Sequence, residues 1–360
     1  MSATPADDAE ILALARPDIV ALAPYEHAVF APTLERLHAN ELPWPPHSEP
    51  PDTALHRYPE PQPAALLAAL ASHYGVSAEQ LLVGRGSDEG IDLLTRAFCR
   101  AGADAVIICP PTFGMYAVAA RIQGAAVVNV PLGKDYALDD AGVIAALDPR
   151  VKLVWLCSPN NPTGDLDDLK SIAQWGRKYR VPVFSDECYV EFTWSRQPES
   201  ILQHGVDGVI ALHSLSKRSN LAGVRVGFYA GDNDIVNYLK EVRKHVGMLV
   251  PGPTQAAAVV ALNDDAHVTV QRDVYLRRLE TLATVLSKWS GFKIDLPNGG
   301  FYLWFDAKDG WAFAEQLAKE GGALVSPGDF YGAGGANNVR VAVVAPDAKI
   351  ALVAQRLAKK

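Results

Sequence analysis

Between residues 81 and 230 the chain repeats one pattern, in which a short apolar run is followed by a polar turn and then by a stretch with helical spacing. The runs that predict strands are 81–83, 105–109, 125–130, 151–157, 181–185, 208–213 and 224–230. Most of them are apolar throughout rather than alternating, so both faces of each strand should be buried. Strands of this kind, separated by amphipathic helices, predict an α/β fold with three layers, in which helices cover both faces of a mainly parallel sheet.

The pattern changes after about residue 232. Two helical stretches, at 234–250 and at 254–289, are followed by strand-like segments that alternate with further helices, which predicts a smaller α+β domain. A proline-rich segment at residues 40–63 marks the other boundary. We therefore divide the chain into a large domain of residues 41–250 and a small domain made of residues 1–40 and 251–360.

Composition excludes several classes of function. The formal net charge of the 360 residues is −8 and no basic cluster interrupts the acidic balance, which disfavours binding to nucleic acid or to an anionic membrane. No apolar run approaches the length of a membrane span, and the polar, acidic first residues do not resemble a secretory leader. The four cysteines lack the spacing of a metal site. These features predict a cytoplasmic protein without a metal.

In proteins with a parallel sheet, ligands bind beyond the carboxyl ends of the strands. The polar residues that follow each apolar run are therefore candidates for a binding site. The run at 81–83 is followed by a glycine-rich turn with Ser87 and Asp88, where free backbone N–H groups and a helix dipole suit an anion. Either residue could instead simply cap the helix. Phe113 follows the next run, where its ring could stack on a flat ligand or belong to the core.

Three further runs end in polar residues. Asn161 lies in the turn after 151–157, Asp186 and Tyr189 follow 181–185, and Ser214 and Lys217 follow 208–213. An acid just beyond a buried strand is either a cap or part of a site. A lysine flanked by small hydroxyl residues, eight positions before an arginine, is unusual for a solvated loop.

Together these segments resemble a known family. The motifs Asn-Pro-x-Gly at 161–164, Asp-x-x-Tyr at 186–189, Ser-x-x-Lys at 214–217 and Gly-x-Arg at 223–225 are similar to those of class I/II aminotransferases of pyridoxal-5′-phosphate (PLP) fold type I. Each motif is weak alone, but their order and their places at predicted strand exits make the set specific. The resemblance covers nearly the whole chain and implies a PLP-dependent transaminase.

The resemblance implies roles for the catalytic residues. Lys217 matches the lysine that forms a Schiff base with PLP and moves the substrate proton, which requires the amine in its neutral form. Asp186 matches the carboxylate that keeps the pyridine nitrogen protonated, so that the ring acts as an electron sink. Asn161 and Tyr189 match the residues that hydrogen-bond the phenolate oxygen, and Phe113 matches the ring that stacks on the cofactor.

The resemblance also implies how anionic groups are held. The residues that match the phosphate cradle are Ser87, Asp88, Ser214 and Arg225. Tyr58 matches a tyrosine that reaches the phosphate of the neighbouring subunit, which implies a homodimer with a shared active site. Arg340 matches the arginine that binds the substrate carboxylate, and Tyr25 is expected beside the substrate.

Two subfamilies divide the sequence. The first part, including Arg57–Pro63 and Gly84–Gly90, is similar to histidinol-phosphate aminotransferases of histidine biosynthesis. The remainder, including Ser214–Gly223 and Ser326–Gly332, is similar to actinobacterial N-succinyldiaminopimelate aminotransferases of lysine biosynthesis. The histidinol-phosphate family places an additional arginine where this chain has Gly322–Ser326, which lacks one.

We therefore expect an N-succinyldiaminopimelate aminotransferase with glutamate as amino donor, and keep histidinol-phosphate aminotransferase as the alternative. The division also suggests the hypothesis that the chain is a hybrid of two aminotransferase families. A PLP decarboxylase or lyase on the same fold would keep the same cofactor residues.

Overall fold

The computed structural model describes residues 11–20, 55, 58–332 and 334–359. Its largest sheet has seven strands in the order β1-β7-β6-β5-β4-β2-β3. They are β1 (Leu81–Gly84), β2 (Ala105–Ile108), β3 (Ala126–Asn129), β4 (Val151–Cys157), β5 (Val183–Asp186), β6 (Val209–Ser214) and β7 (Gly227–Gly231). β7 alone runs opposite to the other six strands, and it is antiparallel to both of its neighbours, β1 and β6. The predicted α/β fold with a mainly parallel sheet is confirmed.

Successive strand residues face opposite sides of this sheet, and both sides are covered. Trp155 packs in a core with α3 (Ser87–Phe98), α4 (Met115–Gln123) and α8 (Asn233–His245). The next residue, Leu156, packs in a second core with α5 (Asp140–Ala146) and α6 (Leu169–Tyr179). Apolar side chains at consecutive positions are therefore buried on both faces, as the uninterrupted apolar runs predict.

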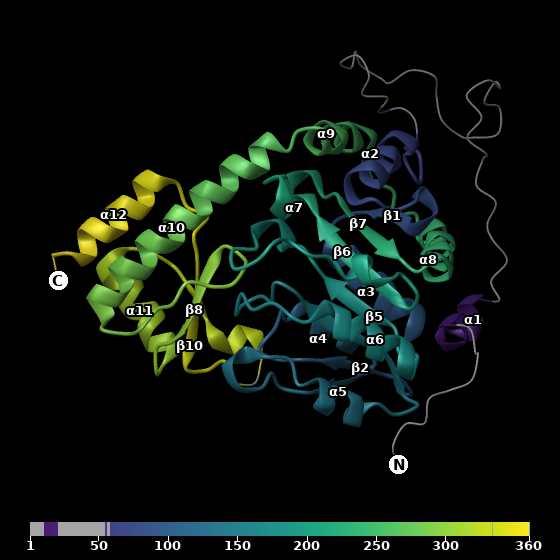
Figure 1. The fold of residues 1–360 in the computed structure, drawn as a ribbon, viewed down its shortest axis with the longest axis horizontal. Helices are drawn as coiled ribbons and strands as arrows, with labels where there is room; N and C mark the ends of the chain where they lie inside the picture. Colours follow the sequence, from purple (N-terminus) through teal and green to yellow (C-terminus); the bar gives the residue numbers. More distant parts are fainter. Residues whose placement is uncertain (1–10, 21–54, 56–57, 333, 360) are drawn as a thin grey trace.

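A second sheet, with strand order β8-β10-β9, has its own core. Its elements are α10 (Ala266–Ser290), β8 (Tyr302–Asp306), α11 (Gly310–Gly321), β9 (Ser326–Pro327), β10 (Asn338–Ala342) and α12 (Asp347–Leu357). Figure 1 shows this unit on the left and the seven-stranded sheet on the right, with α10 leading from one towards the other. The division of the chain at residues 40 and 250 stays a prediction.

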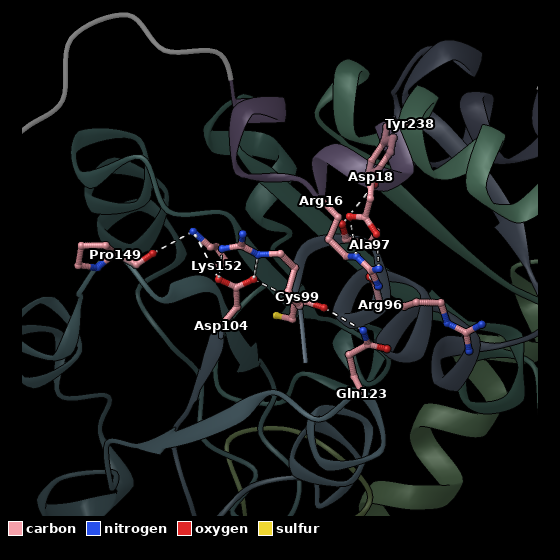
Figure 2. Close-up of polar contacts among 11 residues, drawn as sticks. Arg16, Asp18, Arg96, Ala97, Cys99, Asp104, Gln123, Pro149, Lys152 and Tyr238 are labelled. Carbon is pink, nitrogen blue, oxygen red and sulfur yellow. Dashed lines mark hydrogen bonds and ion pairs between the residues drawn. The ribbon is translucent and has the colours of Figure 1, made fainter. Parts of the chain in front are cut away.

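The segment of residues 11–20, which we assigned to the small domain, packs instead on helices of the large sheet. The Arg16 backbone N–H donates to the Ala97 carbonyl at 3.1 Å, and Tyr238 of α8 donates to the same carbonyl at 3.2 Å. Figure 2 shows these contacts together with Asp104, which accepts from Arg100 at 2.9 Å. This polar cluster joins the carboxyl end of α3 to the start of β2.

Several elements differ from the sequence-based expectation. The helix expected at 234–250 ends at His245, and Gly247 then adopts a positive φ of 64°. The strand expected at 224–230 begins only at Gly227, because residues 222–224 form a 3₁₀ turn. Two further segments, α2 (Ala64–Tyr74) and α9 (Gly252–Leu262), pack together beside β1. None of the helices in the described ranges is both long and apolar enough to span a bilayer.

Candidate active site

The carboxyl ends of β4, β5 and β6 bring the predicted polar residues together. Asp186, the last residue of β5, lies opposite Cys157 at the end of β4 and opposite Leu212 in β6. Asn161 follows β4, Tyr189 follows β5 and Lys217 follows β6. Parallel neighbours that end at the same edge place these side chains around the end of β5, as the sequence predicts.

Asp186 is buried, with only 3% of its surface exposed. Its Oδ2 accepts from the Tyr116 hydroxyl at 2.8 Å, and its Oδ1 accepts from the Cys188 backbone N–H at 3.1 Å. Burial raises the pKa of the Asp186 carboxyl, and these hydrogen bonds offset the rise only in part. The carboxylate is thus held by neutral donors and forms no ion pair within the described part of the chain.

Tyr116 is a site residue that the sequence reasoning missed. Its ring stacks on Trp155 with 5.2 Å between centroids and 4° between planes, and its hydroxyl reaches Asp186. Phe113 packs edge-on against it at 5.7 Å and is itself only partly buried. The available signal was the spacing Phe-x-x-Tyr across the start of α4, where positions three apart share a helix face.

Lys217 lies in a single-turn helix, α7 (Leu215–Arg218), that follows β6 directly. Ser214 caps this helix, because its Oγ accepts the Ser216 N–H at 3.2 Å. The Lys217 side chain is half-buried, and its Nζ lies 6.0 Å from the centroid of the Tyr189 ring. Burial raises the pKa of the Tyr189 phenol, which therefore keeps its proton and stays a hydrogen-bond donor.

Arg225 lies between the start of α3 and the turn that carries Lys217. Its guanidinium donates to the Arg85 carbonyl and to the Ser216 Oγ, each at 3.4 Å, and lies 3.8 Å from the Asp88 carboxylate. Gly86 has a φ of +89°, and a Cβ there would lie 2.8 Å from Nη2 of Arg225. The glycine-rich turn thus makes room for a guanidinium whose side chain is 48% exposed and faces the helix start.

Ser87, the first residue of α3, connects this turn to the strand exit that carries Asp186. Burial raises the pKa of the Cys188 thiol, and a hydrogen bond with the Ser87 side chain opposes that rise. Cys188 in turn donates its backbone N–H to Asp186. A continuous set of contacts therefore runs from Arg225 past the start of α3 to the buried carboxylate.

Arg340 reaches the same edge from the second sheet. Its Nη1 donates to Oδ1 of Asn161 at 2.9 Å, and its guanidinium lies 5.6 Å and 5.1 Å from the ring centroids of Tyr302 and Tyr331. Its Nε is buried without a hydrogen-bond partner in the ranges that the structure describes. Because the Asn161 oxygen accepts from Arg340, the amide Nδ2 remains as a donor.

Two further residues were predicted for the site. Tyr58 is 65% exposed and precedes α2, and its expected role towards a neighbouring subunit stays a prediction. Tyr25 lies outside the described residues.

Comparison with known proteins identifies the family. The model of aminotransferase class I and II matches residues 49–357. A probable aminotransferase from Mycobacterium tuberculosis is 39% identical over 81% of this chain and 70% of its own length. A histidinol-phosphate aminotransferase from Xanthomonas campestris is 40% identical over 87% of this chain and 88% of its own.

The fold is similar to that of BacF from Bacillus subtilis in its substrate-bound structure, with a TM-score of 0.78 and 26% identity over 85% of this chain and 82% of that chain. The aminotransferase resemblance drawn from the strand-exit motifs is confirmed. The chain belongs to the class I and II aminotransferases and is a transaminase.

Proposed function

We propose that the chain transfers amino groups with PLP held at Lys217. When bound, PLP supplies an electron sink for the charge that develops when the substrate Cα loses its proton. The observation that carries this proposal is the buried Asp186, a carboxylate whose hydrogen-bond donors in the described residues are neutral. A protonated pyridine nitrogen is the cation that such a carboxylate lacks.

The surrounding residues fit the other parts of this cofactor. The turn at Gly86 leaves space for Arg225, and the first N–H groups of α3 have no intrahelical acceptor, so both suit a phosphate dianion. Asn161 Nδ2 and the Tyr189 hydroxyl can both donate to a phenolate oxygen. Phe113, edge-on to Tyr116, offers a ring at the strand exit for stacking on the cofactor.

Lys217 supplies the base. Its Nζ would accept the proton that the substrate Cα loses, while PLP, when bound, would supply the electron sink that makes this proton acidic. α7 holds the lysine beside Tyr189, and Ser214 fixes the first turn of that helix. A lysine on a short capped helix is more precisely placed than one on an irregular loop.

Arg340 binds the α-carboxylate of the substrate. Its Nη1 is held by Asn161 and its guanidinium lies against two tyrosine rings, so the side chain is oriented before substrate arrives. Its Nε has no hydrogen-bond partner among the described residues. A bidentate fork to a carboxylate is stronger and more directional than a single ammonium contact. Glutamate is the amino donor that we propose for this site.

Two acceptor classes are each favoured by a specific observation. In the second sheet, Ser326 pairs directly opposite Arg340, so an uncharged side chain lies beside the arginine. Ser326 belongs to the segment in which the histidinol-phosphate family has a second arginine. This favours N-succinyldiaminopimelate, our first candidate. The 40% identity to a histidinol-phosphate aminotransferase favours histidinol phosphate, our second.

Half-reactions separate these candidates. Purified protein loaded with PLP is mixed with glutamate, N-succinyldiaminopimelate or histidinol phosphate, and the loss of cofactor absorbance is followed. We expect conversion with glutamate and with N-succinyldiaminopimelate. Conversion with histidinol phosphate but not with N-succinyldiaminopimelate would reverse the order, and release of CO₂ without conversion would indicate a decarboxylase.

A pair of lysine variants tests whether Lys217 holds the cofactor. Lys217→Ala should abolish both cofactor absorbance and amino transfer, whereas Lys293→Ala, at a surface position paired with Asp295, should change neither. Turnover by Lys217→Ala with glutamate would refute the assignment.

We also propose that two subunits share the site through Tyr58. Mixing inactive Lys217→Ala subunits with Tyr58→Phe subunits should then give hybrids with partly restored activity.

A further inference from the structure

A buried ion pair lies directly behind the start of α3. Glu89 in the first turn of α3 and Arg243 of α8 have side chains that are 4% and 2% exposed. Arg243 Nε donates to Glu89 Oε1 at 2.5 Å, and Nη2 lies 3.5 Å from the other carboxylate oxygen. Removing two charges from water is costly, so the pair by itself contributes little net stability.

The buried pair is also bonded to the glycine-rich turn before α3. The Glu89 carboxylate also accepts the backbone N–H of Arg85 at 2.5 Å. Tyr229 of β7 donates its hydroxyl to the Gly86 carbonyl at 2.7 Å, and its ring leaves no room for a Cβ on Gly84 or Gly90. The turn that precedes Ser87 is therefore held at two successive residues, Arg85 by Glu89 and Gly86 by Tyr229.

Arg243 is the group that fixes Glu89. Its remaining nitrogen, Nη1, donates to the Pro61 carbonyl at 3.5 Å, which ties the pair to the segment before α2. Without the guanidinium, the carboxylate would stay buried, unpaired and free to turn away from the Arg85 N–H. It would also leave a negative charge within one helical turn of the position where an anion is expected.

We propose that Arg243 is a positioning residue for the cofactor phosphate, which acts through Glu89 on the glycine-rich turn. This inference rests on the proposed function, because it takes the start of α3 as the phosphate site. Arg225 can reach the phosphate directly, since half of its side chain is exposed. Arg243 is enclosed and acts only by orienting the turn and by neutralising the carboxylate.

Pyridoxal, which lacks the phosphate, separates this role from a general one. Dissociation constants for PLP and for pyridoxal are measured on the full-length protein and on Arg243→Met, which keeps most of the apolar bulk. We expect PLP to bind about tenfold more weakly or worse in the variant, since an oriented donor set is lost. Pyridoxal affinity should change by less than about threefold. Lys240→Met, on the same helix but bonded to the Glu79 carbonyl, is the control and should leave both constants unchanged.

A double variant tests whether the effect passes through Glu89. Glu89→Gln combined with Arg243→Met keeps an acceptor for the Arg85 N–H and leaves no unpaired charge, so PLP affinity should return to within about threefold of the wild-type value. If Arg243→Met does not fold, Arg243→Lys takes its place, because an ammonium cannot hold both Glu89 oxygens as the guanidinium does, and PLP binding should again weaken more than pyridoxal binding. A double variant that folds but binds PLP as weakly as pyridoxal would overturn it.

These measurements separate the positioning role of Arg243 from the phosphate site itself. If the wild-type protein binds PLP no more tightly than pyridoxal, the phosphate is not held at α3 and the proposed function fails. If the wild-type protein prefers PLP and Arg243→Met keeps the full preference, the positioning role alone is refuted. Equal weakening of PLP and pyridoxal would mean that Arg243 serves only stability, which also refutes it.

Discussion

Replacing Tyr116 with phenylalanine removes one hydroxyl from the candidate site and keeps the ring that stacks on Trp155. The hydroxyl donates to the buried Asp186 carboxylate at 2.8 Å, and a hydrogen bond to a charged group contributes about 1.5–3 kcal/mol. Its loss disfavours the ionised carboxylate and hence the protonated ring nitrogen. We expect PLP affinity and kcat/KM each to fall about tenfold to hundredfold near neutral pH.

The assay is a PLP titration together with steady-state kinetics, repeated at increasing pH. The defect should shrink as the pH rises, because ionisation of Asp186 is restored. Tyr238→Phe is the matched control, since its hydroxyl donates to the Ala97 carbonyl in the contacts of Figure 2, at the carboxyl end of α3 and away from Asp186. If Tyr116→Phe keeps wild-type PLP affinity and turnover at neutral pH, the hydrogen bond does not support Asp186 in the way described.

Three further predictions concern the anion sites and the pH dependence. Arg340→Lys should raise KM for glutamate about tenfold or more, as the bidentate fork is lost, while PLP affinity stays close to that of the wild type; an unchanged KM would contradict the substrate role. Gly86→Ala should weaken PLP binding in a titration, because the φ of +89° and the 2.8 Å approach of Arg225 both exclude a Cβ at this position. Gly102→Ala is the control for backbone strain, since Gly102 also has a positive φ but has open space around it. Burial raises the pKa of Asp186 in the free protein, so PLP should bind more tightly as the pH rises through that pKa, and titrations with Asp186→Asn should lose this dependence.

The strands and the edge that carries the site could be predicted because their signals are local. The run at 151–157 is apolar at consecutive positions, and β4 occupies those same residues with Trp155 and Leu156 in different cores. A parallel sheet then fixes where the polar residues after each strand must lie. The roles of Lys217 and Asp186 came from the resemblance, since no local pattern distinguishes a catalytic lysine from a solvated one.

The site contacts that could not be predicted join parts of the chain that are far apart in sequence. Tyr116 and Asp186 are 70 positions apart, and an aromatic residue on an amphipathic helix is more often a core residue. Glu89 and Arg243 are separated by 154 positions and gave no pattern beyond that of ordinary helix residues. Ser214 was expected at the phosphate; its hydroxyl accepts the Ser216 N–H at the start of α7 and keeps its own hydrogen to donate, so that role stays a prediction.

Borohydride reduction shows directly which lysine carries the cofactor. Treating the PLP-loaded protein with borohydride fixes the cofactor on its lysine, and peptide mass spectrometry then locates the added mass. We expect the modification on Lys217, within the peptide that spans the end of β6 and α7. Stoichiometric modification of a different lysine, with Lys217 unmodified, would contradict it.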